Sequence, residues 1–422
     1  MTEKMKPSGF DYLGNIPASW DVKRFKYCVQ ICNGGEYADI EVEEGGYPVI
    51  GSGGEFARAS KYCYRGESVL LGRKGTVDKP LYVNDAFWCV DTMFYTKAKQ
   101  GMIPKFLYYC ALCFRFDYYV TATALPSMTQ KDLGSEMIAV PPTNEQQAIA
   151  DFLDIQCAKI DSVIADIEKQ IETLQKYKKS LITEAVTKGL DQSVPMKDSG
   201  VKWVGEVPVD WKVSRVKYLI DENHPYPIGD GDHGMIKADD YLDEGIPYIR
   251  VLNLTWGDGM NLDNLVFISD KMNAMIKNSE LRPNDILIAK TGATIGKTAI
   301  VPESLPISNT TSHVGKITLP HTHCAKYFFY VMTSDVVQKQ IQDISAMQST
   351  RPELGIEGMR DLVVVVPPLA TQERIAEYLD ECCAKTDEIL QTKKAQLDIM
   401  KKHKASIIYE YVTGKKRVTE VN

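Results

Sequence analysis

The run SGFDYLGNIPASWDVKRFKY, at residues 8–27, returns as SGVKWVGEVPVDWKVSRVKY at residues 199–218. Both copies carry Ser-Gly, then Gly-x-x-Pro-x-x-Trp, and both end in Lys-Tyr. A second block, VPPTNEQQAIADFLDIQCAKIDSVI from Val140, is echoed by VPPLATQERIAEYLDECCAKTDEIL from Val366. Two blocks that recur in the same order indicate that the chain arose by internal duplication.

A weaker echo lies between the two blocks. RGESVLLGRKG, at residues 65–75, resembles RPNDILIAKTG at residues 282–292. The separation of matching segments rises along the chain, from 191 residues at the first block to 217 here and 226 at the last. Insertions in surface loops of one copy produce such an ordered drift, whereas chance matches would scatter.

Each Val-Pro-Pro is followed by a pattern of helical period. Apolar residues recur at alternating spacings of three and four, which predicts a coiled-coil seam in both helices. Lys178 and Lys404 interrupt the seam at equivalent places, either to fix its register or by simple surface drift. Gly189 and Gly414 follow the helices and can end them. The predicted pairing residues are Ile160, Ile164, Ile167, Ile171, Leu174, Leu181, Leu390, Leu397, Met400 and Ile407.

The segments between the helices read mainly as short strands punctuated by Gly and Pro, with an aromatic helix near 104–119 and another near 325–342. The predicted fold is therefore α+β. Two mixed α/β domains are separated by two long antiparallel coiled-coil helices, in a pseudo-two-fold internal repeat. The expected boundaries are 1–142 for the first domain, 143–190 for the central helix, 191–367 for the second domain and 368–422 for the C-terminal helix.

Bulk composition bounds the function. The net charge of −7 argues against a protein that coats DNA without sequence preference. No run of apolar residues is long enough for a membrane span, the start MTEKMKPSGF lacks a signal-peptide core, and ten scattered cysteines read as reduced thiols. We expect a cytoplasmic protein without a metal site. Cys110 and Cys113 form a C-x-x-C within an aromatic run, which favours core packing over metal binding.

Two loops combine glycine with basic and hydroxyl residues, as DNA contacts require. They occupy equivalent places in the two copies, although an ordinary hairpin with solvated charges would look similar. The first loop contributes Arg73, Lys74, Gly75 and Thr76, and the second Lys290, Thr291, Gly292, Thr294 and Lys297. Further candidates for DNA binding are Arg58, Lys61, Ser127, Arg250, Asn253, Thr350 and Arg351.

Motifs for catalysis are not found. The run from Gly292 to Lys297 has three residues between its glycines, where a phosphate-binding loop needs four. Asp285 precedes Lys290 without the second acid of a metal-dependent nuclease, and the prolines after Val140 and Val366 lack the residues of an adenine-methylating signature. Catalytic residues are therefore predicted to be absent, and the chain is not expected to be an enzyme.

The chain resembles the specificity subunits of type I restriction-modification systems. The resemblance rests on KDSGVKWVGEVPVDWKVSRVKYL from Lys197, on its N-terminal copy, and on the two Val-Pro-Pro…Gln…Ile-Ala…Leu-Asp blocks, and it covers nearly the whole chain. It implies two target-recognition domains that each read half of a bipartite double-stranded DNA site. It also implies that the loops at 73–76 and 290–297 are recognition-domain turns.

The resemblance further implies partners and a role in phage defence. Two methyltransferase (modification) subunits would bind S-adenosylmethionine, and restriction subunits would use ATP and Mg²⁺, so that this chain itself would need no cofactor. The alternative is a scaffold that bridges proteins through its long helices without reading DNA. A scaffold predicts no sequence preference in DNA binding even when its partners are present.

Overall fold

A computed structural model describes residues 4–119, 126–257, 259–346 and 352–418. The chain forms two compact units, residues 1–169 with 394–422, and residues 170–393. Each unit therefore combines a folded domain with half of each long helix, α5 (Thr143–Lys188) and α10 (Leu369–Val412). The boundaries predicted from sequence set the helices apart from the domains, whereas the compact units divide each helix between them.

Unit 1 is built around two four-stranded sheets. The first is antiparallel with order β4-β11-β8-β9, and the second is mixed with order β6-β5-β10-β7, in which β5 and β10 are parallel. Two small pairs, β1-β2 and β3-β12, complete it. The strands are β1 (Met5–Pro7), β2 (Asn15–Pro17), β3 (Asp21–Arg24), β4 (Val29–Asn33), β5 (Tyr47–Gly51), β6 (Gly54–Ala59), β7 (Tyr64–Arg65), β8 (Ser68–Gly72), β9 (Leu81–Val83), β10 (Ala86–Cys89), β11 (Met93–Ala98) and β12 (Met137–Val140).

Unit 2 repeats this plan. Its four-stranded antiparallel sheet has order β16-β22-β19-β20, its mixed sheet has order β18-β17-β21, and β13-β14 and β15-β23 form the small pairs. The strands are β13 (Met196–Asp198), β14 (Glu206–Pro208), β15 (Lys212–Arg215), β16 (Ile228–Asp230), β17 (Ile246–Ile249), β18 (Val266–Ile268), β19 (Ile286–Ala289), β20 (Thr298–Ile300), β21 (Asn309–Thr310), β22 (Val314–Ile317) and β23 (Val363–Val366). The duplication predicted from sequence is thus confirmed, although among the described residues the mixed sheet of unit 2 has no counterpart of the outer strand β7.

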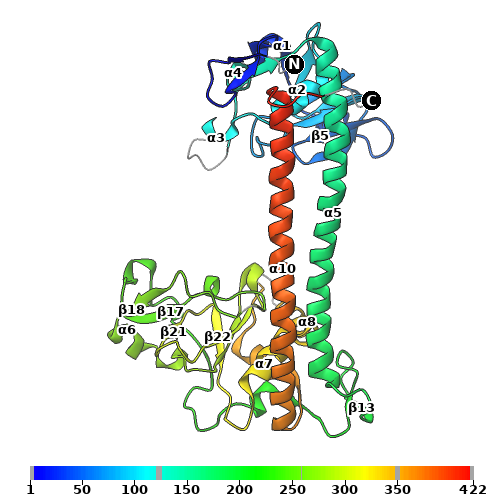
Figure 1. Ribbon diagram of the computed structural model, residues 1–422. Coiled ribbons are helices and arrows are strands. Elements are labelled where there is room, and N and C mark those ends of the chain that lie inside the picture. The colour runs from blue at the N-terminus through cyan, green and yellow to red at the C-terminus, as the bar shows by residue number, and fades with distance from the viewer. Residues whose placement is uncertain (1–3, 120–125, 258, 347–351, 419–422) are drawn as a thin grey trace. The chain divides into compact units, whose positions relative to one another are not determined.

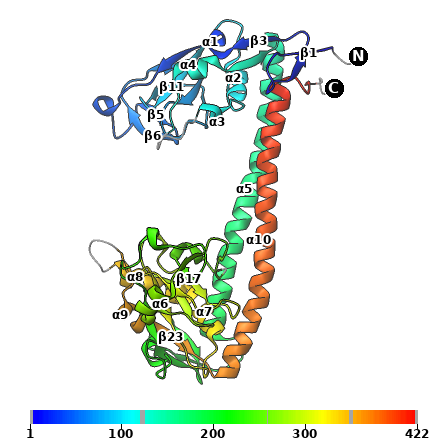
Figure 2. The ribbon, with the colours of Figure 1, turned by 90° about the vertical axis from the view of Figure 1, so that its left-hand side faces the viewer.

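Short helices complete each unit, and the aromatic helices predicted from sequence are present. In unit 1 they are α1 (Phe25–Cys28), α2 (Pro104–Ala111), α3 (Phe116–Tyr119) and α4 (Gln130–Ser135), with the 3-10 turn η1 (Ala38–Ile40). In unit 2 they are α6 (Asp270–Met275), α7 (Ala325–Thr333), α8 (Asp335–Ala346) and α9 (Ile356–Asp361), with the 3-10 turns η2 (Val216–Tyr218), η3 (Ala238–Asp240), η4 (Val251–Asn253), η5 (Lys277–Ser279) and η6 (Gly292–Thr294). Figure 2 shows α6 to α9 around the sheets of unit 2.

The long helices supply part of each core. Ile182, Ala185 and Val186, near the end of α5, are buried in the main hydrophobic cluster of unit 2. Near the end of α10, Ile408 and Val412 are buried in the corresponding cluster of unit 1. Each unit therefore needs the start of the helix that follows its own domain and also the end of the other helix. Figure 1 shows the two helices side by side.

The helix ends fit closely against a tryptophan in each unit. Gly189 and Gly414 both have a positive φ, of 83° and 70°, as expected for glycine just past a helix end. A Cβ at Gly189 would lie 3.1 Å from the ring of Trp211, and one at Gly414 would lie 3.1 Å from the ring of Trp20. The predicted helix ends are confirmed, but the C-terminal helix stops at Val412 instead of filling 368–422.

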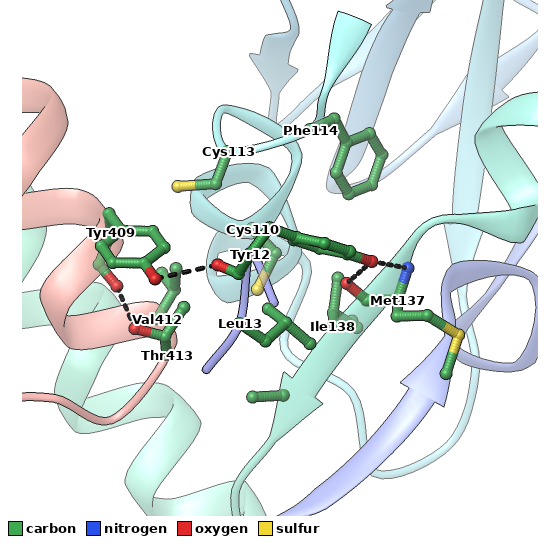
Figure 3. A pocket seen from close by; sticks show the side chains of 11 residues that line it. Tyr12, Leu13, Cys110, Cys113, Phe114, Met137, Ile138, Tyr409, Val412 and Thr413 are labelled. Carbon is green, nitrogen blue, oxygen red and sulfur yellow. Dashed lines mark hydrogen bonds between the residues drawn. The ribbon is translucent and has the colours of Figure 1, made fainter. Parts of the chain in front are cut away.

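In unit 1, hydrogen bonds fasten the last turns of α10 to the N-terminal segment around a small pocket (Figure 3). The Tyr409 hydroxyl donates to the carbonyl oxygen of Tyr12 at 2.8 Å. The Tyr12 hydroxyl accepts from the Met137 N–H at 3.1 Å. Cys110 and Cys113 also line this pocket as free thiols, and burial raises the pKa of Cys113 to about 12. The C-x-x-C therefore packs in the core, as predicted.

The long helices pack together as predicted, whereas the pairing of the individual seam residues stays a prediction. Every predicted pairing residue, from Ile160 to Ile407, is buried or half-buried. The two lysines that interrupt the seam form equivalent ion pairs. In unit 2 the Lys178 ammonium lies 2.6 Å from a carboxylate oxygen of Asp387, and in unit 1 that of Lys404 lies 2.7 Å from Asp161. Both pairs join the two helices in antiparallel order, which favours a register role over surface drift.

The ion pairs differ in burial, which predicts a difference in stability. Asp387→Asn removes the counter-charge of Lys178, whose side chain is 11% exposed, and should lower the free energy of unfolding by about 1–2 kcal/mol. Asp161→Asn removes the counter-charge of Lys404, whose side chain is 29% exposed, and should lower the free energy of unfolding by less than about 1 kcal/mol. Chemical denaturation of the full chain measures both. Equal losses, or the reverse order, would contradict this interpretation.

Candidate nucleic-acid interface

Backbone hydrogen bonds at the end of one strand in each sheet align the two candidate loops. In unit 1, the Arg73 N–H donates to the Thr92 carbonyl oxygen, and the Arg73 carbonyl oxygen accepts from the Met128 N–H. In unit 2, the Lys290 N–H donates to the His313 carbonyl oxygen, and the Lys290 carbonyl oxygen accepts from the Leu354 N–H. Arg73 therefore corresponds to Lys290, and strand pairing from these two residues makes Asn33 equivalent to Asp230. The structure confirms the alignment of these loops that the sequence predicted.

The loop of unit 1 leaves its lysine accessible. Arg73 is half-buried, donates from its guanidinium to the Asp91 carbonyl oxygen at 3.1 Å, and lies over the Phe94 ring. Lys74 is exposed and forms a β-bridge with Ser127, which is also exposed. Gly75 adopts a φ of 82°, and Thr76 is half-buried. The structure thus brings Arg73–Thr76 and Ser127 together, as a contact surface would require.

The equivalent position in unit 2 has a different environment. Lys290 is only 2% exposed, and its ammonium bonds to the carboxylate of Asp230 and lies 3.7 Å from that of Glu353. Asp230 itself is 6% exposed. We therefore correct the predicted DNA contact at Lys290, because a buried lysine committed to a buried carboxylate cannot reach a phosphate or a base. In sequence, Lys290 and Arg73 each precede a glycine loop after a strand. The partner that buries Lys290, Asp230, comes from β16.

The rest of the second loop is more accessible than Lys290. Gly292 is exposed with a φ of 68°, and it begins the 3-10 turn η6. Thr291 and Thr294 are half-buried and joined by a hydrogen bond from the Thr294 hydroxyl to the Thr291 carbonyl oxygen. Lys297 is half-buried. For these four residues, contact with DNA stays a prediction.

Other candidates divide into engaged and accessible residues. Asn253 is fully buried, accepts from the Arg250 N–H at 2.9 Å and donates to the Asn261 carbonyl oxygen, so its role is to shape a turn and not to contact bases. Arg250 is half-buried and donates to the Asn264 carbonyl oxygen. The guanidinium of Arg58 is occupied by Glu55 and by two backbone carbonyls.

Three candidates remain. Lys61 is exposed, so contact with DNA stays a prediction there. Thr350 and Arg351 lie outside the described residues.

Among the residues that are described, no three His, Cys, Asp or Glu side chains gather as metal ligands would. None of the described helices is both long enough and apolar enough to cross a lipid bilayer.

Sequence reasoning missed the loop that follows β16, residues 231–234. Asp232 in this loop is buried, and burial alone would raise the pKa of its carboxyl group. Hydrogen bonds from the Ile236 N–H, the Tyr248 hydroxyl and the Ser312 N–H outweigh that effect and hold the pKa below its usual value. The run Gly-Asp-Gly-Asp-His-Gly at residues 229–234 was a visible signal, but its counterpart Cys-Asn-Gly-Gly-Glu-Tyr, at residues 32–37, shares too little sequence to reveal the equivalence.

The chain matches one protein family over most of its length. The family described as "Type I restriction modification DNA specificity domain" matches residues 17–173 and residues 208–398. The two matched segments correspond closely to the two copies of the repeat.

Characterised relatives of the chain are distant but extensive. The Type I restriction enzyme MjaVIII specificity subunit of Methanocaldococcus jannaschii is 23% identical over 96% of this chain and 95% of its own length. The Type I restriction enzyme EcoBI specificity subunit of Escherichia coli is 22% identical over 76% of this chain and 68% of its own length. A chain solved in work titled "Structural basis underlying complex assembly and conformational transition of the type I R-M system" superposes with a TM-score of 0.67 at 14% identity, covering 95% of this chain and 99% of that one. The fold is therefore shared.

The contrast between the two lysines of the second loop can be measured. Lys290→Ala leaves the Asp230 carboxylate buried without its cation and should lower the free energy of unfolding by roughly 3–5 kcal/mol. Lys297→Ala removes the same charge from a half-buried position and should cost below about 1 kcal/mol. Denaturation followed by tryptophan fluorescence reports both variants. If Lys290→Ala also lowers the free energy of unfolding by less than about 1 kcal/mol, Lys290 does not stabilise the fold through its ion pair.

Proposed function

Because the chain belongs to the type I restriction modification DNA specificity family, we propose that each of its two units reads one half of a bipartite DNA target. The observation that carries this proposal is the equivalence of the units. Both matched segments, 17–173 and 208–398, contain a four-stranded antiparallel sheet with equivalent strand order and a candidate loop after the equivalent strands β8 and β19. Two readers of one design but different loop residues would recognise two different short sequences.

The candidate loops supply groups of the right kind. Lys74, next to Ser127 in unit 1, is an exposed cation beside a hydroxyl, which suits a phosphate contact. The net charge of −7 predicts weak DNA binding by the isolated chain, with phosphate neutralisation left to partners. Adding the partners should therefore tighten binding, and raising the salt concentration should weaken it.

We further propose that the chain has no catalytic centre and acts with two methyltransferase subunits. Those subunits would hold S-adenosylmethionine, and restriction subunits using ATP and Mg²⁺ would join them for phage defence. Each long helix has an exposed apolar residue at an equivalent position, where one methyltransferase subunit could dock. Val163 on α5 and Ile389 on α10 occupy equivalent positions of the repeat and are 43% and 46% exposed, although both are apolar. A cytoplasmic location is supported by ten cysteines that are all free.

The main experiment maps methylated adenines in DNA from the source cell, with and without this gene. The proposal predicts that a two-part motif with an unspecified spacer is methylated only when the gene is present. Unchanged methylation would contradict it and would favour a scaffold without a DNA-reading role. A purified chain that methylates or cuts DNA by itself would instead show that it is an enzyme.

The docking sites can be tested one at a time. Val163→Asp and Ile389→Asp each place a charge in a proposed apolar contact and should weaken binding of one methyltransferase subunit by about tenfold or more. Native mass spectrometry should then find one such subunit in each single variant and none in the double variant. Gln175→Asp, at an exposed polar position of α5, is the matched control and should keep two. Two bound subunits in both single variants would rule out these sites.

A further inference from the structure

The loop after β16 presents a histidine on a fixed backbone. Gly231 approaches the chain so closely that a Cβ there would lie 1.9 Å from the Thr310 carbonyl oxygen. The carboxylate of Asp232 accepts hydrogen bonds from the N–H groups of Gly234 and Ile236 and from the Tyr248 hydroxyl, at 2.8–3.0 Å. Between them His233 has a φ of 48°, which side-chain-bearing residues seldom adopt. Its position is thus set by its neighbours and not by its own preference.

The His233 side chain lies next to the buried ion pair of Asp230 and Lys290. Its Nε2 lies 3.1 Å from Oδ1 of Asp230, while the side chain as a whole is 67% exposed. The other carboxylate oxygen of Asp230 bonds to Lys290. Within the described residues, Nδ1 of His233 has no hydrogen-bond partner. Asp230 therefore orients one ring nitrogen, and the other is left to act as a donor or an acceptor.

Unit 1 has the same frame with different chemistry. Asn33 corresponds to Asp230 by strand register, and a Cβ at the following Gly34 would lie 1.9 Å from the Val90 carbonyl oxygen, as at Gly231. Counting on from these glycines, Glu36 takes the place of His233, and it too is exposed. Asn33 carries no charge, and its Oδ1 accepts from the Gln130 side chain at 2.9 Å. The backbone geometry shared by the two units thus presents an acid in unit 1 and an imidazole in unit 2.

We propose that His233 contacts a base edge in the half-site read by unit 2, and that Asp230 and Lys290 are positioning residues that orient its ring. The inference rests on the proposed function, because it assigns a base-reading residue within one of the two readers. A phosphate contact is the competing assignment. Phosphate recognition would favour a cation at this place in both units, and the carboxylate of Glu36 would repel a phosphate. At this position the backbone is alike in the two units, but the side chain differs, Glu36 in one and His233 in the other. This difference fits base reading, since an acid and an imidazole would select different base edges.

The test uses the full chain in complex with its methyltransferase subunits, in cells, with methylated adenines mapped across the genome. His233→Ala should make about one base position degenerate in one half of the motif and lower methylation of the original motif by about tenfold. The other half and the spacer should stay unchanged. His233→Gln, which keeps a donor and an acceptor, should change the preferred base and not merely lose it. Asp230→Asn should relax the same position, because the ring loses its orienting charge.

His321→Ala, an exposed histidine before α7, is the matched control and should leave the motif intact. An unchanged motif in His233→Ala would overturn the inference. Uniformly weaker methylation with an unchanged motif would also overturn it, since that pattern marks a phosphate contact or a structural role. Because the His233 side chain is exposed, its variants should fold even if Asp230→Asn does not. A wild-type chain that directs no two-part motif would instead refute the proposed function.

Discussion

Each unit of this chain depends on a helix end that belongs to the other copy of the repeat. The core of unit 2 needs Ile182 and Val186 from the end of α5, and the core of unit 1 needs Ile408 and Val412 from the end of α10. A single copy would leave an apolar helix end uncovered and a domain core open. The burial of these side chains therefore joins the two copies, and the ion pairs Lys178–Asp387 and Lys404–Asp161 fix the register in which they meet.

The same constraint separates what must stay constant from what can vary. Positions that close the cores repeat between the copies. Trp20 and Trp211 pack against Gly414 and Gly189, and the hydroxyls of Tyr109 and Tyr330 both donate to an aspartate of the adjacent long helix, Asp154 or Asp380. Positions on the loops do not repeat. A frame held by repeated contacts allows loop residues to change without loss of fold, as two readers of different sequences require.

The architecture was predictable from sequence because it rests on repeated, locally encoded signals. The seam residues, the helix-ending glycines and the two matching blocks are visible in the letters alone. The site was less predictable, since burial of a polar residue depends on a partner far away in sequence. In sequence, Lys290 occupies the same kind of position as Arg73. The structure shows that it pairs with Asp230, which comes from another strand. His233 was missed because its loop is equivalent to that of Glu36 in strand register but not in sequence.

The central claim is that two equivalent readers in one chain each determine one half of a two-part target. The most direct measurement replaces the first reader, residues 17–140, with a second copy of residues 208–366, and maps methylated adenines in cells that carry the modified gene. The account predicts a motif in which the same half-site occurs twice and the half-site of unit 1 is lost. Methylation that still follows the original two-part motif would contradict it.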